Sequence, residues 1–206
     1  MLKIYAGLAV VAVAGLLGGT YYVALQRSAN DPFADCRTSV VAGGAGDIGG
    51  PFTLVDEDGK TVTDKDVLAK PSLVYFGYSF CPDVCPLDNA RNAEAVDLLK
   101  AKGLDVTPVF ITIDPERDTP EALKDFTANL HPNMIGLTGT PEQVQAASRA
   151  YKTYYKKQET GDQYYLMDHS TFTYLMLPGT GFADFFTRDD TAQQIADRTA
   201  CFIEKS

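Results

Sequence analysis

The sequence predicts an α/β sandwich domain behind an apolar N-terminal segment, and three observations lead to this fold class. Two continuous apolar runs, 72–76 and 106–113, are typical of strands buried on both faces, and a stretch of helical periodicity separates them. Strand, helix and strand in this order imply a parallel pair. Near the C-terminus, two strands joined by a Pro-Gly turn precede a last helix. The 206 residues, 45% of them hydrophobic, suffice for one ordinary domain plus an appendage.

The appendage lies at the N-terminus. No charged residue interrupts positions 4–25, which is about the ~20 residues that a helix needs to cross a bilayer. We expect residues 1–27 to form an uncleaved transmembrane anchor, with a cleaved signal peptide as the alternative. The Gly-rich stretch 41–51 is too poor in apolar residues to pack as an element, so residues 28–50 are predicted to be a flexible tether before the domain 51–206.

Within the domain, each predicted element follows from local signals. Residues 52–62 read as a hairpin because Asp58-Gly59 supplies the turn, and Asp118 or Thr119 is the expected cap of a helix that begins at Pro120. The remaining predicted elements are helices over about 87–99, 120–130, 141–151 and 191–203 and strands over 72–76, 106–113, 134–137, 164–167, 173–177 and 182–186. This order predicts a thioredoxin-like α/β sandwich.

Two cysteines, Cys81 and Cys85, follow the buried strand 72–76 in the segment Cys-Pro-Asp-Val-Cys-Pro. Two thiols at a strand-to-helix junction can hold a soft metal or exchange electrons. Pro86 favours a helix N-cap at Cys85, where the macrodipole should lower the pKa of the Cys85 thiol. A purely structural disulfide between them is the less favoured alternative, since so short a loop restricts the unfolded chain little.

The chain has two histidines and two further cysteines. His131 is expected to meet the last carbonyls of a helix, whereas His169 is a candidate metal ligand that the neighbouring Asp168 could orient. Cys36 and Cys201 stand at opposite ends of the soluble part. They are candidates for a disulfide that would pin the tether to the last helix, with two free thiols or a third ligand role as alternatives.

Charge and cysteine usage limit the partners and the compartment. The formal net charge of −9 argues against nucleic acid, which needs a concentrated positive surface. The basic cluster 151–157 is interpreted as a solvated face. Four cysteines behind an export-type segment indicate the oxidising side of a membrane, and we expect the periplasm.

Three linked motifs then carry a family resemblance. In chain order they are Tyr-Phe-Gly-Tyr with Cys-Pro-Asp-Val-Cys-Pro (75–86), Ile-Asp-Pro-Glu-Arg-Asp-Thr-Pro (113–120) and Asp-His-Ser with Tyr-Leu (168–175). From about Gly50 to the C-terminal helix, the chain resembles the Sco/SenC family of copper-binding cytochrome c oxidase assembly factors. The resemblance implies that Cys81, Cys85 and His169 bind Cu(I) and Cu(II). Many members carry His where this chain has Phe80, so the entrance to this site is more apolar.

The resemblance implies a copper chaperone anchored in the inner membrane by its N-terminal helix. It would take copper from a donor protein and deliver it to the binuclear centre in subunit II of cytochrome c oxidase. A thiol-disulfide oxidoreductase that reduces the subunit's cysteines is the main alternative, and a redox or copper sensor is the other. Three residues between the cysteines, where redox enzymes of this fold have two, favour metal binding. The loop 114–118 is interpreted as a turn and helix cap.

Overall fold

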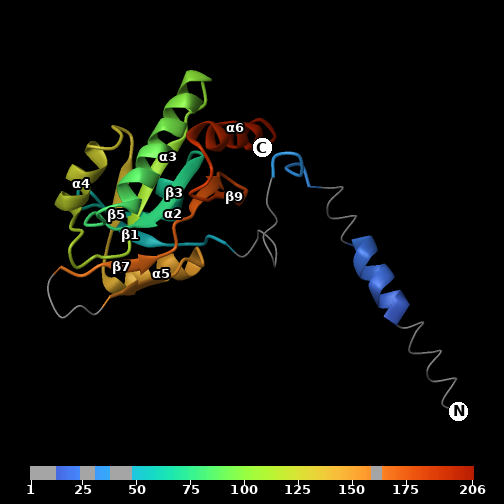
Figure 1. Cartoon of the computed structure of the whole chain (residues 1–206), viewed down its shortest axis with the longest axis horizontal. Coiled ribbons are helices and arrows are strands. Elements are labelled where there is room, and N and C mark those ends of the chain that lie inside the picture. The colour runs from blue at the N-terminus through green and yellow to red at the C-terminus, as the bar shows by residue number, and fades with distance from the viewer. Residues whose placement is uncertain (1–12, 24–30, 38–47, 159–163) are drawn as a thin grey trace, which may run out of the picture.

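The computed structural model describes residues 13–23, 31–37, 48–158 and 164–206. A seven-stranded sheet in the order β2-β1-β5-β4-β3-β8-β9 forms the centre, and helices cover both of its faces (Figure 1). Its strands are β1 (Thr53–Asp56), β2 (Thr61–Thr63), β3 (Ser72–Gly77), β4 (Thr107–Thr112), β5 (Ile135–Thr138), β8 (Thr173–Leu177) and β9 (Gly181–Phe186). The predicted α/β class is confirmed.

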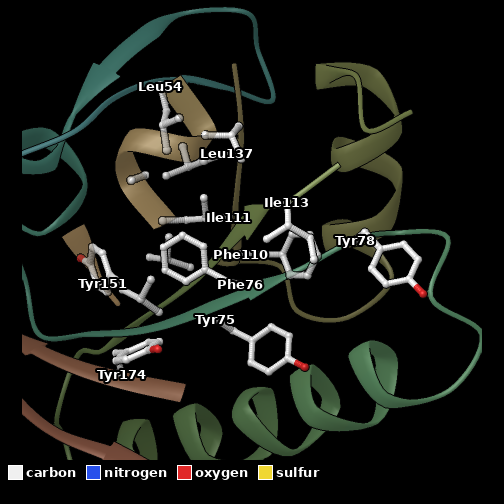
Figure 2. Close-up of a cluster of buried hydrophobic side chains, with 14 of the residues drawn as sticks. Leu54, Tyr75, Phe76, Tyr78, Phe110, Ile111, Ile113, Leu137, Tyr151 and Tyr174 are labelled. Atoms are coloured by element: carbon white, nitrogen blue, oxygen red, sulfur yellow. The ribbon is translucent and has the colours of Figure 1, made fainter. Parts of the chain in front are cut away.

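The middle of the sheet is parallel and deeply buried. β3 pairs in parallel with β4, and β4 with β5, as the strand-helix-strand pattern predicts. All six residues of β3 are buried. Successive residues of β3 face opposite layers, so Tyr75 reaches Asp88 of the helix α3 (Val84–Ala101), whereas Phe76 packs on Tyr151 (Figure 2). Tyr151 follows the helix α5 (Pro141–Ala150) on the other face of the sheet.

The predicted hairpin and the predicted starts of three helices are confirmed in detail. In the β1–β2 turn, the carboxylate of Asp56 accepts hydrogen bonds from the backbone of Asp58 and Lys60, and Gly59 takes a φ of 80°. The helices α4 (Pro120–Ala128), α5 (Pro141–Ala150) and α6 (Ala192–Glu204) each begin after a threonine whose hydroxyl accepts a hydrogen bond from the first turn. A short helix, α2 (Asp64–Val67), follows β2.

One strand pair stands apart from the main sheet. β6 (Tyr155–Lys157) and β7 (Met167–His169) pair only with each other among the described residues, with Tyr155 opposite His169. The sequence pattern predicts a strand at 164–167, which begins three residues before β7, and only a basic face at 151–157. The sequence does not predict β6, because Tyr-Lys-Lys lacks the alternation of apolar and polar residues that is typical of a half-buried strand.

The N-terminal segments lie partly outside the described residues. Residues 13–23 are helical and exposed, and the expected anchor 1–27 also includes 1–12 and 24–27, which are not described. Within the described ranges, no helix has the length and apolar character needed to cross a membrane. In the predicted tether, residues 31–37 dock on the domain: Phe33 packs on Phe202, and Cys36 forms a disulfide with Cys201 of α6.

Candidate metal centre

The fold brings Cys81, Cys85 and His169 together, although 84 positions separate the second cysteine from the histidine. One donor atom from each residue lies within 4.8 Å of the other two, and Cys85 Sγ is 3.4 Å from His169 Nε2. Thiolates and imidazoles bind a metal such as zinc at about 2.0–2.3 Å, which places donors on one ion roughly 3–4.6 Å apart. These three donors therefore suit a single shared ion with only small shifts.

The two sulfurs take unequal positions at the start of α3. The helix begins at Val84 after the cap position Asp83, so Cys85 is its second residue and the expected N-cap at Cys85 is wrong. Pro86 is tolerated inside the first turn because the N–H groups there have no helical partner anyway. Cys81 Sγ instead accepts a hydrogen bond from the Cys85 N–H at 3.4 Å. The sulfur of Cys81 thus faces the positive end of the helix.

This asymmetry decides which thiol is ionised. The hydrogen bond from the Cys85 thiol, together with those from the backbone N–H groups of the helix start, lowers the pKa of Cys81. The same thiol-thiol hydrogen bond and burial raise the pKa of Cys85. The expectation of a lowered pKa at Cys85 is therefore wrong, and the thiolate belongs to Cys81. The Cys85 proton must leave when a metal binds both sulfurs.

Gly77, the last residue of β3, makes room for Cys85. A Cβ atom at Gly77 would lie 2.9 Å from Cys85 Sγ and 2.8 Å from Cε1 of Tyr75. Real Cβ atoms do not approach other atoms so closely, so any side chain here would displace the sulfur or the ring. The backbone of β3 at Gly77 therefore packs directly against the sulfur of Cys85.

His169 reaches the sulfurs from β7. Its Nδ1 lies 2.8 Å from the carbonyl oxygen of Ser170, so Nδ1 carries the proton and Nε2 is left as the donor facing Cys85. The rings of Tyr75 and Tyr78 meet the imidazole edge-on, at centroid distances of 6.3 and 5.8 Å. These contacts hold the ring in an orientation suited to a metal ligand.

Asp168 was expected to orient this imidazole, and the structure corrects that expectation. Neighbouring residues of a strand point to opposite faces, so Asp168 is exposed and accepts a hydrogen bond from Gln158 at 2.6 Å. The Ser170 carbonyl takes the orienting role. His131 lies elsewhere: its Nδ1 accepts from the Asn133 N–H and its Nε2 lies 3.4 Å from Asp97 Oδ1, so the imidazole meets a backbone N–H and a carboxylate rather than the expected helix carbonyls.

The chain is similar to known proteins over most of its length. A family model described as SCO1/SenC matches residues 41–204. The chain belongs to the SCO1/SenC family. Protein SenC of Rhodobacter capsulatus is 55% identical over 196 residues, covering 95% of this chain and 88% of that protein. The human mitochondrial SCO1 homolog is 41% identical over 72% of this chain and 50% of its own length.

Solved structures agree with this membership. The copper-bound ScoI of Arabidopsis thaliana superposes with a TM-score of 0.73 at 42% identity, covering 76% of this chain and 99% of that one. The copper-bound ScoI of Bradyrhizobium japonicum gives 0.68 at 38% identity, with 74% and 98% covered. These likenesses confirm the predicted thioredoxin-like α/β fold of the domain.

This SCO1/SenC chain also has buried polar residues beneath the sulfurs that sequence reasoning missed. Asp88 is 2% exposed, accepts a hydrogen bond from Tyr75 Oη at 3.0 Å and pairs with Arg91 at 3.3 Å. Burial is the main reason that the pKa of Asp88 is raised. Asp88 follows Cys85 by three positions on one helix face, so a charged residue at that spacing was the available signal.

Proposed function

We propose that this protein binds copper through Cys81, Cys85 and His169 and delivers it to the binuclear centre in subunit II of cytochrome c oxidase. The observation that carries the proposal is the convergence of two thiols and one oriented imidazole within 4.8 Å. Family membership supports it, because the Arabidopsis and Bradyrhizobium relatives are described with copper bound. Another structural relative, BsSco, is described as a member of the Sco family of cytochrome c oxidase assembly proteins.

The donor set accounts for copper in both oxidation states. Two thiolates satisfy soft Cu(I), and the added imidazole gives a three-donor site that also accepts Cu(II). Zinc would use similar donors, but it usually takes a fourth ligand, and copper binds more strongly in the Irving–Williams order. The same three residues therefore serve whichever oxidation state the donor protein supplies.

Transfer by ligand exchange requires that the incoming ligands reach the metal. Two apolar side chains beside the cysteines, Phe80 and Leu87, are 57% and 60% exposed. Cys81 lies near this surface at 7% exposure, whereas Cys85 is fully buried. An acceptor would reach Cys81 first and Cys85 last. We place this domain in the periplasm, held at the inner membrane by the N-terminal segment 1–27.

A thiol-disulfide oxidoreductase is the second candidate function, and the unequal thiols favour it. Cys81 as thiolate would attack a disulfide in the oxidase subunit and form a mixed disulfide. Cys85 would then attack Cys81 Sγ, releasing the subunit as a dithiol and leaving this protein oxidised by two electrons. The BsSco structure is described as identifying a disulfide switch. This reaction does not need His169.

A transfer experiment separates the two functions. The full chain in detergent, loaded with Cu(I), is mixed with a metal-free fragment of subunit II whose cysteines are already reduced. We expect copper to move to the fragment from the wild-type protein. Copper that stays bound would contradict delivery and favour a sensor.

The second arm uses the copper-free, reduced protein and an oxidised fragment. Rapid reduction of the fragment, equal in wild type and His169→Ala, would support the oxidoreductase. Absence of reduction would leave ligand exchange as the function.

A further inference from the structure

The loop Asp114–Asp118 between β4 and α4 makes more contacts than a turn and helix cap require. The cap of α4 is Thr119, whose hydroxyl accepts from the Ala122 N–H, so Asp118 is not needed for it. Asp114 and Asp118 are 3% and 0% exposed. Carboxylates are almost never so fully buried unless they are paired, so their partners show what the loop holds.

One set of partners belongs to the cysteine arm, the segment 78–85. Asp118 accepts hydrogen bonds from the backbone N–H of Ser79 at 3.0 Å and from its hydroxyl at 2.5 Å. The guanidinium of Arg117 lies 4.9 Å from the ring centroid of Phe80 and 5.7 Å from that of Tyr78. The loop 114–118 thus contacts residues 78–80, which directly precede Cys81.

The other set belongs to the histidine arm, the hairpin of β6 and β7 with Tyr165. Arg117 Nη1 donates to the Tyr165 carbonyl at 3.0 Å, and its guanidinium stacks 3.7 Å from the Tyr165 ring centroid. Tyr165 Oη in turn donates to Asp114 at 2.7 Å, and Asp114 pairs with Arg117 at 2.5 Å. Arg117, Asp114 and Tyr165 therefore form a closed ring of contacts two residues before β7.

These contacts matter because the histidine arm has no strand pairing with the main sheet in the described structure. We propose that Arg117 is a positioning residue that couples the two arms, holding His169 at bonding distance from the cysteine sulfurs. The inference rests on the proposed copper function. Arg117 suits this task because one planar guanidinium can stack on rings and donate in several directions at once, which a lysine cannot do.

The test compares Arg117→Gln with a matched control, Arg198→Gln, in the full chain. Arg198 is similarly buried, pairs with Asp184 at 2.7 Å and lies 4.5 Å from the Phe186 ring centroid, but it contacts β9 rather than either arm. Both variants lose a buried ion pair and a ring contact, and Arg198→Gln also loses a second ion pair, with Asp190 at 2.8 Å. Only Arg117→Gln should disturb the metal centre.

In the metal-free protein, we expect Arg117→Gln to speed amide hydrogen exchange across 165–169, whereas Arg198→Gln leaves that segment at the wild-type rate. In anaerobic titrations, Arg117→Gln should weaken Cu(II) binding about 10-fold, at the low end of the 10–100-fold typical of outer-shell partners. Cu(I) binding should change less, because two thiolates suffice for it. Tyr165→Phe, which keeps the ring but loses the bond to Asp114, should show the same effects more weakly.

Two results would overturn the inference. One is wild-type exchange at 165–169 in Arg117→Gln, and the other is equal loss of Cu(II) affinity in Arg117→Gln and Arg198→Gln. If Arg117→Gln does not fold, Tyr165→Phe carries the same comparison. Failure of the proposed function looks different, because Cu(II) affinity would then be unchanged in His169→Ala as well.

Discussion

The two arms of the metal centre are built in different ways. The cysteine arm joins β3, which pairs with β4 and β8, to the 18-residue helix α3, so both of its ends are fixed in the core. The histidine arm is a pair of three-residue strands outside the main sheet; the short stretch 170–172 links it to β8, and side-chain contacts around Tyr165 join it to the loop 114–118. The sulfurs are therefore held by the main sheet and α3, whereas the imidazole depends more on a few tertiary contacts.

The largest expected effect comes from removing a ligand from each arm. Cys85→Ser should abolish tight binding of both Cu(I) and Cu(II), a loss beyond the 10–100-fold typical of outer-shell changes. His169→Ala should lose Cu(II) affinity but keep Cu(I), because the two thiolates remain. Anaerobic titration with a competing chelator measures both. Equal losses of Cu(I) in the two variants would contradict the division between the arms.

The second-largest effect is expected from removing the disulfide, which lies far from both arms of the metal centre. The bond between Cys36 and Cys201 closes a sequence separation of 165 residues, and its loss through Cys36→Ser with Cys201→Ser should cost about 2–5 kcal/mol of unfolding free energy. Chemical denaturation measures this cost. Copper affinities should stay at the wild-type values, since the disulfide joins residues 31–37 to α6. A parallel drop in copper affinity would show that the arms depend on the whole fold.

A smaller loss is expected from Gly77→Ala, which tests the rigidity of the cysteine arm. The added methyl would overlap Tyr75 and Cys85 Sγ, and overpacking of this kind costs about 1–3 kcal/mol. We expect reduced stability together with weaker copper binding, measured by denaturation and titration. Gly103→Ala is not a clean control, because the φ of Gly103 is 80° and strain would be added there. The control is Ala95→Gly on α3, which should lower the stability of that helix without adding an atom near the metal ligands. It should leave copper affinity unchanged.

The pH dependence of alkylation should be nearly flat for one thiol. Because its pKa is lowered, Cys81 stays a thiolate well below the pH at which an ordinary thiol is protonated, so its rate with iodoacetamide should fall far less from about pH 8 to 5 than that of an ordinary thiol. An ordinary thiol of pKa 9.0 would lose about tenfold per pH unit below that value. Mass mapping of the reduced, metal-free protein measures the rates. Faster labelling of Cys85 than of Cys81 would refute the assignment.

The smallest effect is expected at Asp168. Because its carboxylate points away from the imidazole and accepts from Gln158, Asp168→Asn should change Cu(II) affinity by less than the 10-fold expected of a residue that orients a ligand. Titration beside the wild type checks this. A loss of 10-fold or more would restore Asp168 as an orienting group for His169.

Much of the fold was predictable because its signals are local. The buried run of β3, the Asp58-Gly59 turn and the threonine caps before Pro120 and Pro141 each appear in a few neighbouring residues. β6 was not predictable in the same way, because Tyr155 is held by its pairing with His169 rather than by its own periodicity. The N-cap at Cys85 was misplaced because proline is tolerated throughout the first helical turn.

The same distinction between local signals and contacts of distant segments applies to the metal centre. By itself, the sequence determined the chemistry of this protein: two thiols at a strand-to-helix junction, a late imidazole and two cysteines at the ends of the domain. The tertiary structure alone decided which thiol is ionised, which nitrogen of His169 faces the sulfurs and which residues hold the arms together. These are properties of distances between segments such as 78–85, 114–118 and 165–169, and sequence patterns report neighbours along the chain rather than neighbours in space.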